Sequence, residues 1–357
     1  MSFCEINDIR ELKDFKGVTF SNFKKTDVQK ELMTNLERGR IEPSCYWSSE
    51  LICANHYKDL WEIIILFYSK YIHLANLKLA VYLELRIDNF KDIVNNGYSN
   101  FELNLRNNLK IRNLFCEIIY VICVSNRSHK YDSIKISKLE FNISNLVDKL
   151  KAPNTEFLHA IFKEDDPKDI FIAVNELSFH LSIESKNIIS SCYWIEWLIE
   201  YDIMKRRKNE IFKCERRLYN VSGKYQQNII WIIWDIFIHN SKSKSKLIEK
   251  TINACLNIFS LQYVTAINKK RKYLLYFVVS LLCENSFQES NILKDNQKTK
   301  LTNVFTNLDL IYEQIKKNEY SPQMDYLFEN VKKNNLDNTI KKLETLQSFE
   351  NSFIPRK

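Results

Sequence analysis

The tetrapeptide Ser44-Cys45-Tyr46-Trp47 occurs twice, because 147 residues later the chain contains Ser191-Cys192-Tyr193-Trp194. Each copy follows a run of apolar residues at helical spacing and leads into a polar or charged helical pattern. The apolar residues before the two copies are Val28, Leu32 and Leu36, and Ile170, Val174, Leu177 and Leu181. Self-similarity at a fixed offset is the signature of a repeated structural unit. The sequence therefore predicts two diverged copies of one helical unit.

Glycine and proline are scarce, with four and five residues respectively in a chain of 357. Turn-rich all-β folds and glycine-rich phosphate-binding loops both need more glycine. Hydrophobic residues make up 45% of the chain and aromatic residues 13%, which excludes general disorder. The composition therefore predicts an all-α fold of two diverged helical repeats plus a helical C-terminal tail.

Breaks in the apolar pattern predict five segments. Gly39 and Pro43 separate the first two helices, because glycine ends helices and proline favours their first turn. Proline-containing breaks at 151–154 and 164–167 mark the junction between the two units. The predicted segments are an N-terminal arm (1–24), helical unit 1 (25–128), a linker region (129–164), helical unit 2 (165–287) and a helical tail (288–357).

Helical spacing places several elements within these segments. Thr26 is the expected N-cap of a first helix over 27–38, with Gln29 completing a capping box. Further helices are expected over 77–90, 104–124, 301–315 and 324–346.

The nine cysteines indicate a reducing compartment. Their number is odd and no Cys-x-x-Cys occurs, so we expect buried, reduced thiols in a cytoplasmic protein. The N-terminus carries acidic residues and lacks the apolar core of a signal peptide. The two most apolar runs, 229–238 and 273–283, are half as long as the roughly 20 residues that span a bilayer. We expect them to form buried core helices and expect no membrane partner.

No catalytic or cofactor-binding motif is present in the sequence. The G-x-x-x-x-G-K-[ST] and G-x-G-x-x-G loops are both missing, and the six histidines form no H-E-x-x-H pair. Glu50 and Glu62 lie beside apolar helical faces, where paired carboxylates support acid–base chemistry but are more often solvated or paired with a cation. We therefore expect no enzymatic activity, no cofactor and no metal. A zinc site or an active site assembled from distant residues leaves no local motif and stays open.

Tryptophans follow the apolar runs in both units. One interpretation is a set of stacking platforms for nucleic-acid bases. Aromatic residues at helical spacing inside isoleucine and leucine runs are more often core. We predict that the following five form the structural core of the repeat: Trp47, Trp61, Trp194, Trp197 and Trp231.

Two basic clusters are the strongest candidates for a ligand-binding surface. They comprise Lys205, Arg206, Arg207, Lys208, Arg216 and Arg217, along one helix or its flanks, and Lys269, Lys270, Arg271 and Lys272. Such groups contact phosphates and give salt-dependent nucleic-acid binding. The competing interpretation, which we favour, is a solvated face interleaved with Glu210 and Glu215. The composition is typical of an AT-rich genome, which supplies lysine without selection for an acidic partner, so the net charge of +8 carries little weight.

The region around Trp47 shows two resemblances to known families. Residues 36–83, with Arg38-Gly39, Tyr46-Trp47 and the run Ser69 to Asn76, resemble the helical C-terminal domain of the clamp-loader-like AAA+ ATPases. In that group this domain mediates oligomer assembly and follows an ATPase domain, for which this chain has neither room nor motif. The resemblance implies a helical assembly module.

The second resemblance covers most of the chain. The stretch Gly39 to Trp47, followed by Glu50-Leu51-Ile52-Cys53 and Lys70 to Asn76, is similar to a helical protein family of nucleocytoplasmic large (giant) DNA viruses. The family offers no catalytic residues to transfer, so the likeness implies a viral setting.

Together these features predict a non-enzymatic helical scaffold or adaptor. We expect it to assemble with a protein partner, or with itself, in viral genome replication or particle formation, in the host cytoplasm or the viral factory. The alternative is a nucleic-acid-binding accessory protein of replication that uses the basic helices of unit 2.

Overall fold

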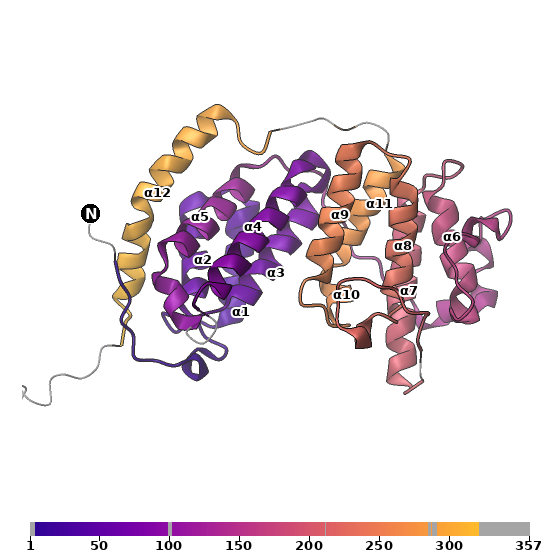
Figure 1. Cartoon of the computed structure of the whole chain (residues 1–357), viewed down its shortest axis with the longest axis horizontal. Helices are drawn as coiled ribbons and strands as arrows, with labels where there is room; N and C mark the ends of the chain where they lie inside the picture. Colours follow the sequence, from indigo (N-terminus) through magenta and orange to yellow (C-terminus); the bar gives the residue numbers. More distant parts are fainter. Residues whose placement is uncertain (1–3, 99–101, 211, 285–286, 288–290, 321–357) are drawn as a thin grey trace, which may run out of the picture.

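The computed structural model describes residues 4–98, 102–210, 212–284, 287 and 291–320 (Figure 1). Over these residues the fold is all-α, as predicted, and their only β-pairing is a single bridge between Val18 and Lys24. The arm contains one short turn, η1 (Leu12–Phe15). The helices of unit 1 are α1 (Lys25–Glu37), α2 (Ile41–Cys53), α3 (Tyr57–Phe67), η2 (Tyr68–Ile72), η3 (His73–Ala75), α4 (Lys78–Asn95), η4 (Glu102–Asn107) and α5 (Leu109–Val124).

Local sequence signals set several helix ends in unit 1. Gly39 follows α1 with φ +67°, the left-handed conformation that glycine adopts without strain. The predicted capping box at Thr26 is wrong, because α1 already begins at Lys25 and the Gln29 amide donates to Asp59 at 3.0 Å instead. The helix expected over 104–124 begins only at Leu109, because the Asn108 side chain accepts from two backbone N–H groups and acts as the N-cap.

The described residues of unit 2 form six α-helices. Short 3-10 turns precede α6 and one follows α7. The elements from residue 138 onward are η5 (Lys138–Phe141), η6 (Ile143–Asn145), η7 (Val147–Lys149), η8 (Glu156–Leu158), η9 (Lys168–Ile170), α6 (Phe171–Leu181), α7 (Ile188–Arg207), η10 (Gly223–Tyr225), α8 (Ile230–Ser241), α9 (Lys246–Ser260), α10 (Ile267–Lys270) and α11 (Lys272–Cys283).

The helices of the two units pack in corresponding pairs. In unit 1, α2 packs against α1, α3 and α5, and in unit 2, α7 packs against α6, α8 and α11. The Ser-Cys-Tyr-Trp element therefore lies on the second helix of each unit and contacts the last helix of that unit. This is the packing that a duplication predicts, and common descent of the two units stays a prediction.

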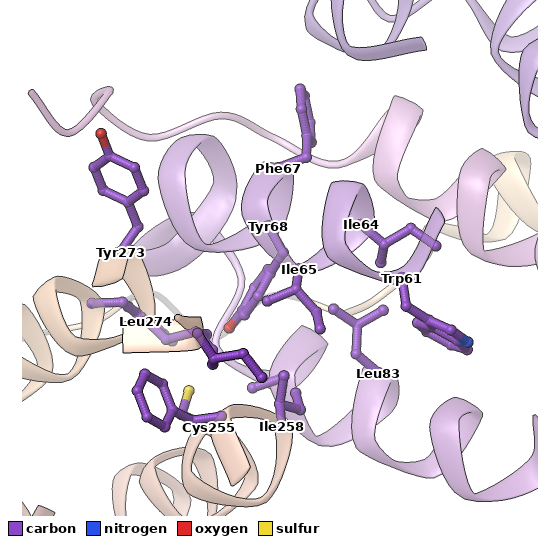
Figure 2. Close-up of a cluster of buried hydrophobic side chains, with 14 of the residues drawn as sticks. Trp61, Ile64, Ile65, Phe67, Tyr68, Leu83, Cys255, Ile258, Tyr273 and Leu274 are labelled. Carbon is purple, nitrogen blue, oxygen red and sulfur yellow. The ribbon is translucent and has the colours of Figure 1, made fainter. Parts of the chain in front are cut away.

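One hydrophobic core runs through both units. Helix α4 packs against α9, and η2 packs against α11. In Figure 2 the side chains of Ile65 and Tyr68 from unit 1 lie beside Leu274 and Cys255 from unit 2. The Tyr68 ring meets Phe277 edge-on at 5.6 Å. The two units are thus joined by buried side chains as well as by the chain itself.

Residues 129–164 lie along unit 2. The Tyr131 hydroxyl and the Ser280 hydroxyl of α11 form a 2.7 Å hydrogen bond, and the indole N–H of Trp197 donates to the Glu140 carbonyl at 2.8 Å. The carboxylate of Glu176 on α6 accepts from the backbone N–H of Lys151 at 2.9 Å. The segment is therefore a covering layer over α6, α7 and α11.

The tail helix, predicted over 301–315, is α12 (Asp295–Lys316), and it returns to unit 1 (Figure 1). It packs against α5 and α2 and buries Leu308, Tyr312 and Ile315. The Arg112 guanidinium of α5 lies over the Tyr312 ring at 3.8 Å. The second tail pattern, over 324–346, lies outside the described residues.

The two most apolar runs form core helices, as predicted. Residues 230–238 belong to α8, with Ile229 as its N-cap, and residues 273–283 belong to α11. Most residues of α8 and nearly all residues of α11 are buried. Within the described part of the chain, no helix has the combination of length and apolar character that a bilayer span requires.

Candidate interaction surfaces

The first basic cluster is divided between two structural elements. Helix α7 ends at Arg207, and the described residues from there to η10, 208–210 and 212–222, lie outside regular helix. Figure 1 shows this end of α7 projecting beyond the neighbouring helices. Arg207, Lys208 and Arg216 are exposed there, whereas Arg217 is buried.

Arg217 lies inside unit 2. Its guanidinium contacts the Asp166 carboxylate at 2.7 Å and also pairs with Asp235, and the residue is only 3% exposed. Burial would lower the pKa of Arg217, but the hydrogen bonds and charges of the two aspartates raise it above its usual value. This guanidinium fastens the segments around residues 166 and 217 to α8 and does not face solvent, so it cannot contact a phosphate.

Two further members of this cluster pair with carboxylates. Arg206 lies 2.9 Å from Asp202, one helical turn away, and Lys205 lies 2.6 Å from Glu210. The hydrogen bond that Lys205 donates to the Glu210 carboxylate raises the pKa of Lys205. Both cations remain accessible at the end of α7, but their charge is largely balanced locally.

The second basic cluster is also tied into the fold. Arg271 is 4% exposed, and it pairs with Glu62 of α3 at 2.7 Å and donates to carbonyls at the C-terminal end of α9. Lys272 lies 2.6 Å from Glu196, and Lys269 lies 2.5 Å from Glu200. Arg271, like Arg217, is therefore a structural cation. Lys270 is exposed.

Carboxylates of α7 separate the two clusters. Glu196 and Glu200 both lie on α7 and form ion pairs with Lys272 and Lys269 of the second cluster. The Tyr276 hydroxyl donates to Glu196 at 2.5 Å, and burial together with this carboxylate raises the pKa of Tyr276. The ten predicted phosphate-contacting residues thus do not form one continuous basic face.

Four of the five tryptophans predicted to be core residues are buried. Trp61, Trp194, Trp197 and Trp231 are at most 6% exposed. Trp47 is only partly buried, and its ring meets the arm residue Phe23 edge-on at 5.5 Å.

The two glutamates considered for acid–base chemistry are both occupied by protein donors. Glu50 is fully buried and accepts from the Ser21 backbone N–H at 3.0 Å and from the Ser21 hydroxyl at 2.5 Å. Glu62 pairs with Arg271. Each carboxylate fastens an arm or a neighbouring helix, which is the structural alternative that the sequence left open.

The nine cysteines are free and buried, as predicted. Burial raises the pKa of the Cys123 thiol to about 11, so little thiolate exists at neutral pH. Among the described residues, no group of three histidine, cysteine or acidic side chains is arranged to hold a metal ion.

The tertiary structure also creates a groove with a mixed apolar and polar lining between α2 and α12, which the sequence did not indicate. It has a volume of about 410 Å³ and is lined by Ile41, Glu42, Cys45, Val304, Asn307, Leu310, Ile311 and Gln314. Leu310 is 57% exposed beside it. In the α12 sequence Leu310 lies outside the apolar stripe of Val304, Leu308, Ile311 and Ile315. A leucine outside the stripe is the sequence signal that could have indicated an exposed apolar position here.

Comparison of the chain with protein-family models, with curated proteins and with solved structures finds no match. The resemblances to the viral family and to the clamp-loader-like domain therefore stay expectations from sequence motifs.

Proposed function

We propose that this protein is a non-enzymatic helical scaffold or adaptor that binds an amphipathic helix of a protein partner in the α2/α12 groove. The observation that supports it most is the exposed Leu310, which lines this groove together with Ile41, Val304 and Ile311. Helix-in-groove recognition uses apolar anchors at i, i+3 or i+4, and i+7 of the bound helix. Glu42 on the rim favours a partner with a basic residue beside those anchors.

The internal use of buried charge supports a scaffold rather than a catalyst. Glu50, Glu62 and Glu196 each bind protein donors that fasten one element to another. A core shared by both units makes a body on which a partner can be held in a defined orientation. A viral setting, with assembly during genome replication or particle formation in the host cytoplasm or viral factory, completes the proposal and rests on the sequence resemblance.

The groove is tested with two exposed leucines of equal accessibility. Leu310 beside the groove is 57% exposed, and Leu85 on α4 is 59% exposed and does not line the groove. Burying one leucine in an interface contributes roughly 1.5–3 kcal/mol, so Leu310→Asp should weaken binding of the partner at least about tenfold. Leu85→Asp should leave it within about twofold.

The measurement proceeds in two stages. Proteins captured by the wild-type chain, by Leu310→Asp and by Leu85→Asp are quantified side by side, and the one that differs is purified and titrated directly. Circular dichroism verifies that both variants keep the wild-type helix content. Equal affinity of the two variants would remove the groove from the proposal, and concentration-dependent mass by light scattering would identify a second copy as the partner.

Nucleic-acid binding remains the alternative, because four cations near the end of α7 are exposed in addition to Arg206, which pairs with Asp202. They are Arg207, Lys208, Lys213 and Arg216. A phosphate-binding surface of four contacts loses affinity steeply with salt, with a log–log slope of about −3 to −4. Fluorescence anisotropy with DNA and RNA at 50 and 200 mM salt compares the wild type with the variant in which all four residues are alanine. Nucleic-acid binding is supported if the wild-type affinity has this salt dependence and the variant does not bind. Weak salt dependence, or equal binding by the variant, would exclude this surface.

A further inference from the structure

Three segments of the chain meet at His73. The residue follows the π-helical turn η2, and its backbone has φ +25°, which is unusual for a residue with a side chain. Its imidazole is fully buried. It stacks on the Tyr131 ring with the ring centroids 4.3 Å apart, and its centroid lies 6.2 Å from that of Phe277 on α11. The ring therefore joins unit 1, the start of the 129–164 segment and unit 2.

The hydrogen bonds of His73 define its protonation state. Its Nε2 lies 2.6 Å from the His129 carbonyl oxygen, which only accepts, so Nε2 carries the hydrogen. Its Nδ1 is buried with no hydrogen-bond partner among the described residues. A second proton would have to be placed on Nδ1, where it would add an unsatisfied donor and a buried charge. The fold thus requires neutral His73.

The ionisable groups around His73 do not compensate a positive charge. The His129 ring lies 4.7 Å away and its charge opposes protonation. Tyr131 bonds to Ser280, and Tyr276 bonds to Glu196, so that carboxylate is already occupied. The charged groups on the packed elements are Lys70, whose Nζ lies over Tyr273, together with Lys130, Lys272 and, near His129, Glu284.

We propose that His73 is an acid-sensitive joint: protonation of its Nδ1 expels the imidazole from between Tyr131 and Phe277 and releases residues 128–131 from η2. Two backbone hydrogen bonds cross this joint, from Ser128 N–H to the Tyr71 carbonyl at 2.8 Å and from Tyr131 N–H to the Lys70 carbonyl at 3.4 Å. Acid therefore uncouples the 128–131 segment from unit 1 while the helical cores on either side persist.

The pKa of His73 supports this geometry. Burial lowers it to about 4, and the nearby His129 adds to the effect, although the hydrogen bond to the His129 carbonyl opposes it. In an opened joint the imidazole regains its usual pKa of about 6.5. The open form thus binds the proton more readily, so the joint weakens as pH falls below about 6.5 and the loss levels off below about 4. Between pH 7 and pH 4.5 the opening equilibrium shifts about 50-fold.

Hydrogen exchange at the joint tests the proposal. Exchange of the Ser128 and Tyr131 amides, corrected for intrinsic rates, should rise about 50-fold from pH 7 to pH 4.5 in the wild type. In His73→Gln the side-chain amide still donates to the His129 carbonyl but does not titrate, so the rise should disappear. His239→Gln, an exposed histidine on α8, is the matched control and should behave as wild type.

Two results would contradict the proposal that His73 is an acid-sensitive joint. One is an equal pH response in wild type and His73→Gln. The other is direct titration of His73 in the wild type by NMR with a pKa near 6.5, a measurement that decides the question even if the glutamine variant does not fold.

Discussion

The two Ser-Cys-Tyr-Trp helices, α2 and α7, make the same contacts within their own turns but are covered in different ways. Ser44 donates to the Arg40 carbonyl at 2.6 Å, and Ser191 donates to the Asn187 carbonyl at 2.8 Å. Each tyrosine hydroxyl donates to a glutamate. On α2 that glutamate is Glu50 of the same helix.

On α7 the corresponding carboxylate comes from a different segment. Tyr193 donates to Glu140 of η5 at 2.9 Å. The arm covers α2 through Ser21 and Phe23, whereas residues 129–164 cover α7. Two packed helices bury the faces that contact each other, but their outer faces stay exposed unless another segment packs on them. In this molecule the N-terminal arm covers α2 and residues 129–164 cover α7.

Each cover is held by a buried arginine. In unit 1, Arg112 donates to the carbonyl of Cys4 in the arm at 2.8 Å. In unit 2, Arg217 donates to the Ile161 carbonyl of the 129–164 segment at 3.3 Å. Arg217 also pairs with the Asp166 carboxylate, just beyond that segment, at 2.7 Å. Both covers are thus held through a carbonyl, but only the arginine of unit 2 also neutralises a buried carboxylate, so the energetic consequences of the two arrangements differ.

The largest effect is expected at the arginine of unit 2. Arg217→Met leaves the Asp166 carboxylate, which is fully buried, without its cation. Breaking a buried ion pair in this way costs about 3–5 kcal/mol. Urea unfolding gives the free energy, and the exposed neighbour Arg216→Met should stay within about 0.5 kcal/mol. Similar losses for the two variants would show that Asp166 is not buried in solution.

The two tryptophans should differ according to their cover. Trp194→Ala removes a side chain that is 1% exposed and should cost about 3–5 kcal/mol. Trp47 is only partly buried, so Trp47→Ala should cost about half as much. The comparison uses unfolding free energies from the same denaturant series. A larger loss at Trp47 would mean that the arm buries more of α2 than the structure shows.

Acid should weaken the attachment of the unit 2 cover, because Glu140 is charged in the folded state. Burial would raise the pKa of Glu140, but hydrogen bonds from Lys149, the Ser137 N–H and Tyr193 lower it overall. Its charged form therefore stabilises the fold at neutral pH, and this contribution is lost as pH falls below about 4.5 through the lowered pKa. Glu140→Gln should flatten the decline in stability between pH 5 and pH 3, whereas the exposed Glu42→Gln should not. Parallel pH profiles for Glu140→Gln and wild type would contradict the assignment.

The smallest effect is expected at the shared serines. Ser44→Ala and Ser191→Ala each remove one hydroxyl that bonds to a carbonyl of its own helix. The lost hydrogen bond and the gain in helix propensity nearly cancel, so each change should stay within about 1 kcal/mol and have the same sign. Opposite signs, measured by thermal unfolding, would argue that the two helices are not equivalent.

Local sequence was sufficient for the helical architecture. Continuous apolar runs over 229–238 and 273–283 predicted core helices, and Gly39 marked the end of α1, because apolar character and backbone preference act over a few neighbouring residues. Helical spacing placed four of the five tryptophans correctly in the core, and Trp47 is the exception. The errors at Thr26 and at the start of α5 lie at helix ends, where a single competing side-chain contact decides the boundary.

The burial of charges was decided only by the tertiary structure. Arg216 and Arg217 are adjacent residues of the same type, yet Arg216 faces solvent and Arg217 lies between two aspartates. Arg271 meets Glu62 across 209 residues of chain, and the α2/α12 groove exists only because the tail returns to unit 1. The pairing of a cation, like the cover of a helix face, depends on which distant segment packs there, because desolvation and ion pairing are set by three-dimensional neighbours and leave no periodic trace in the sequence.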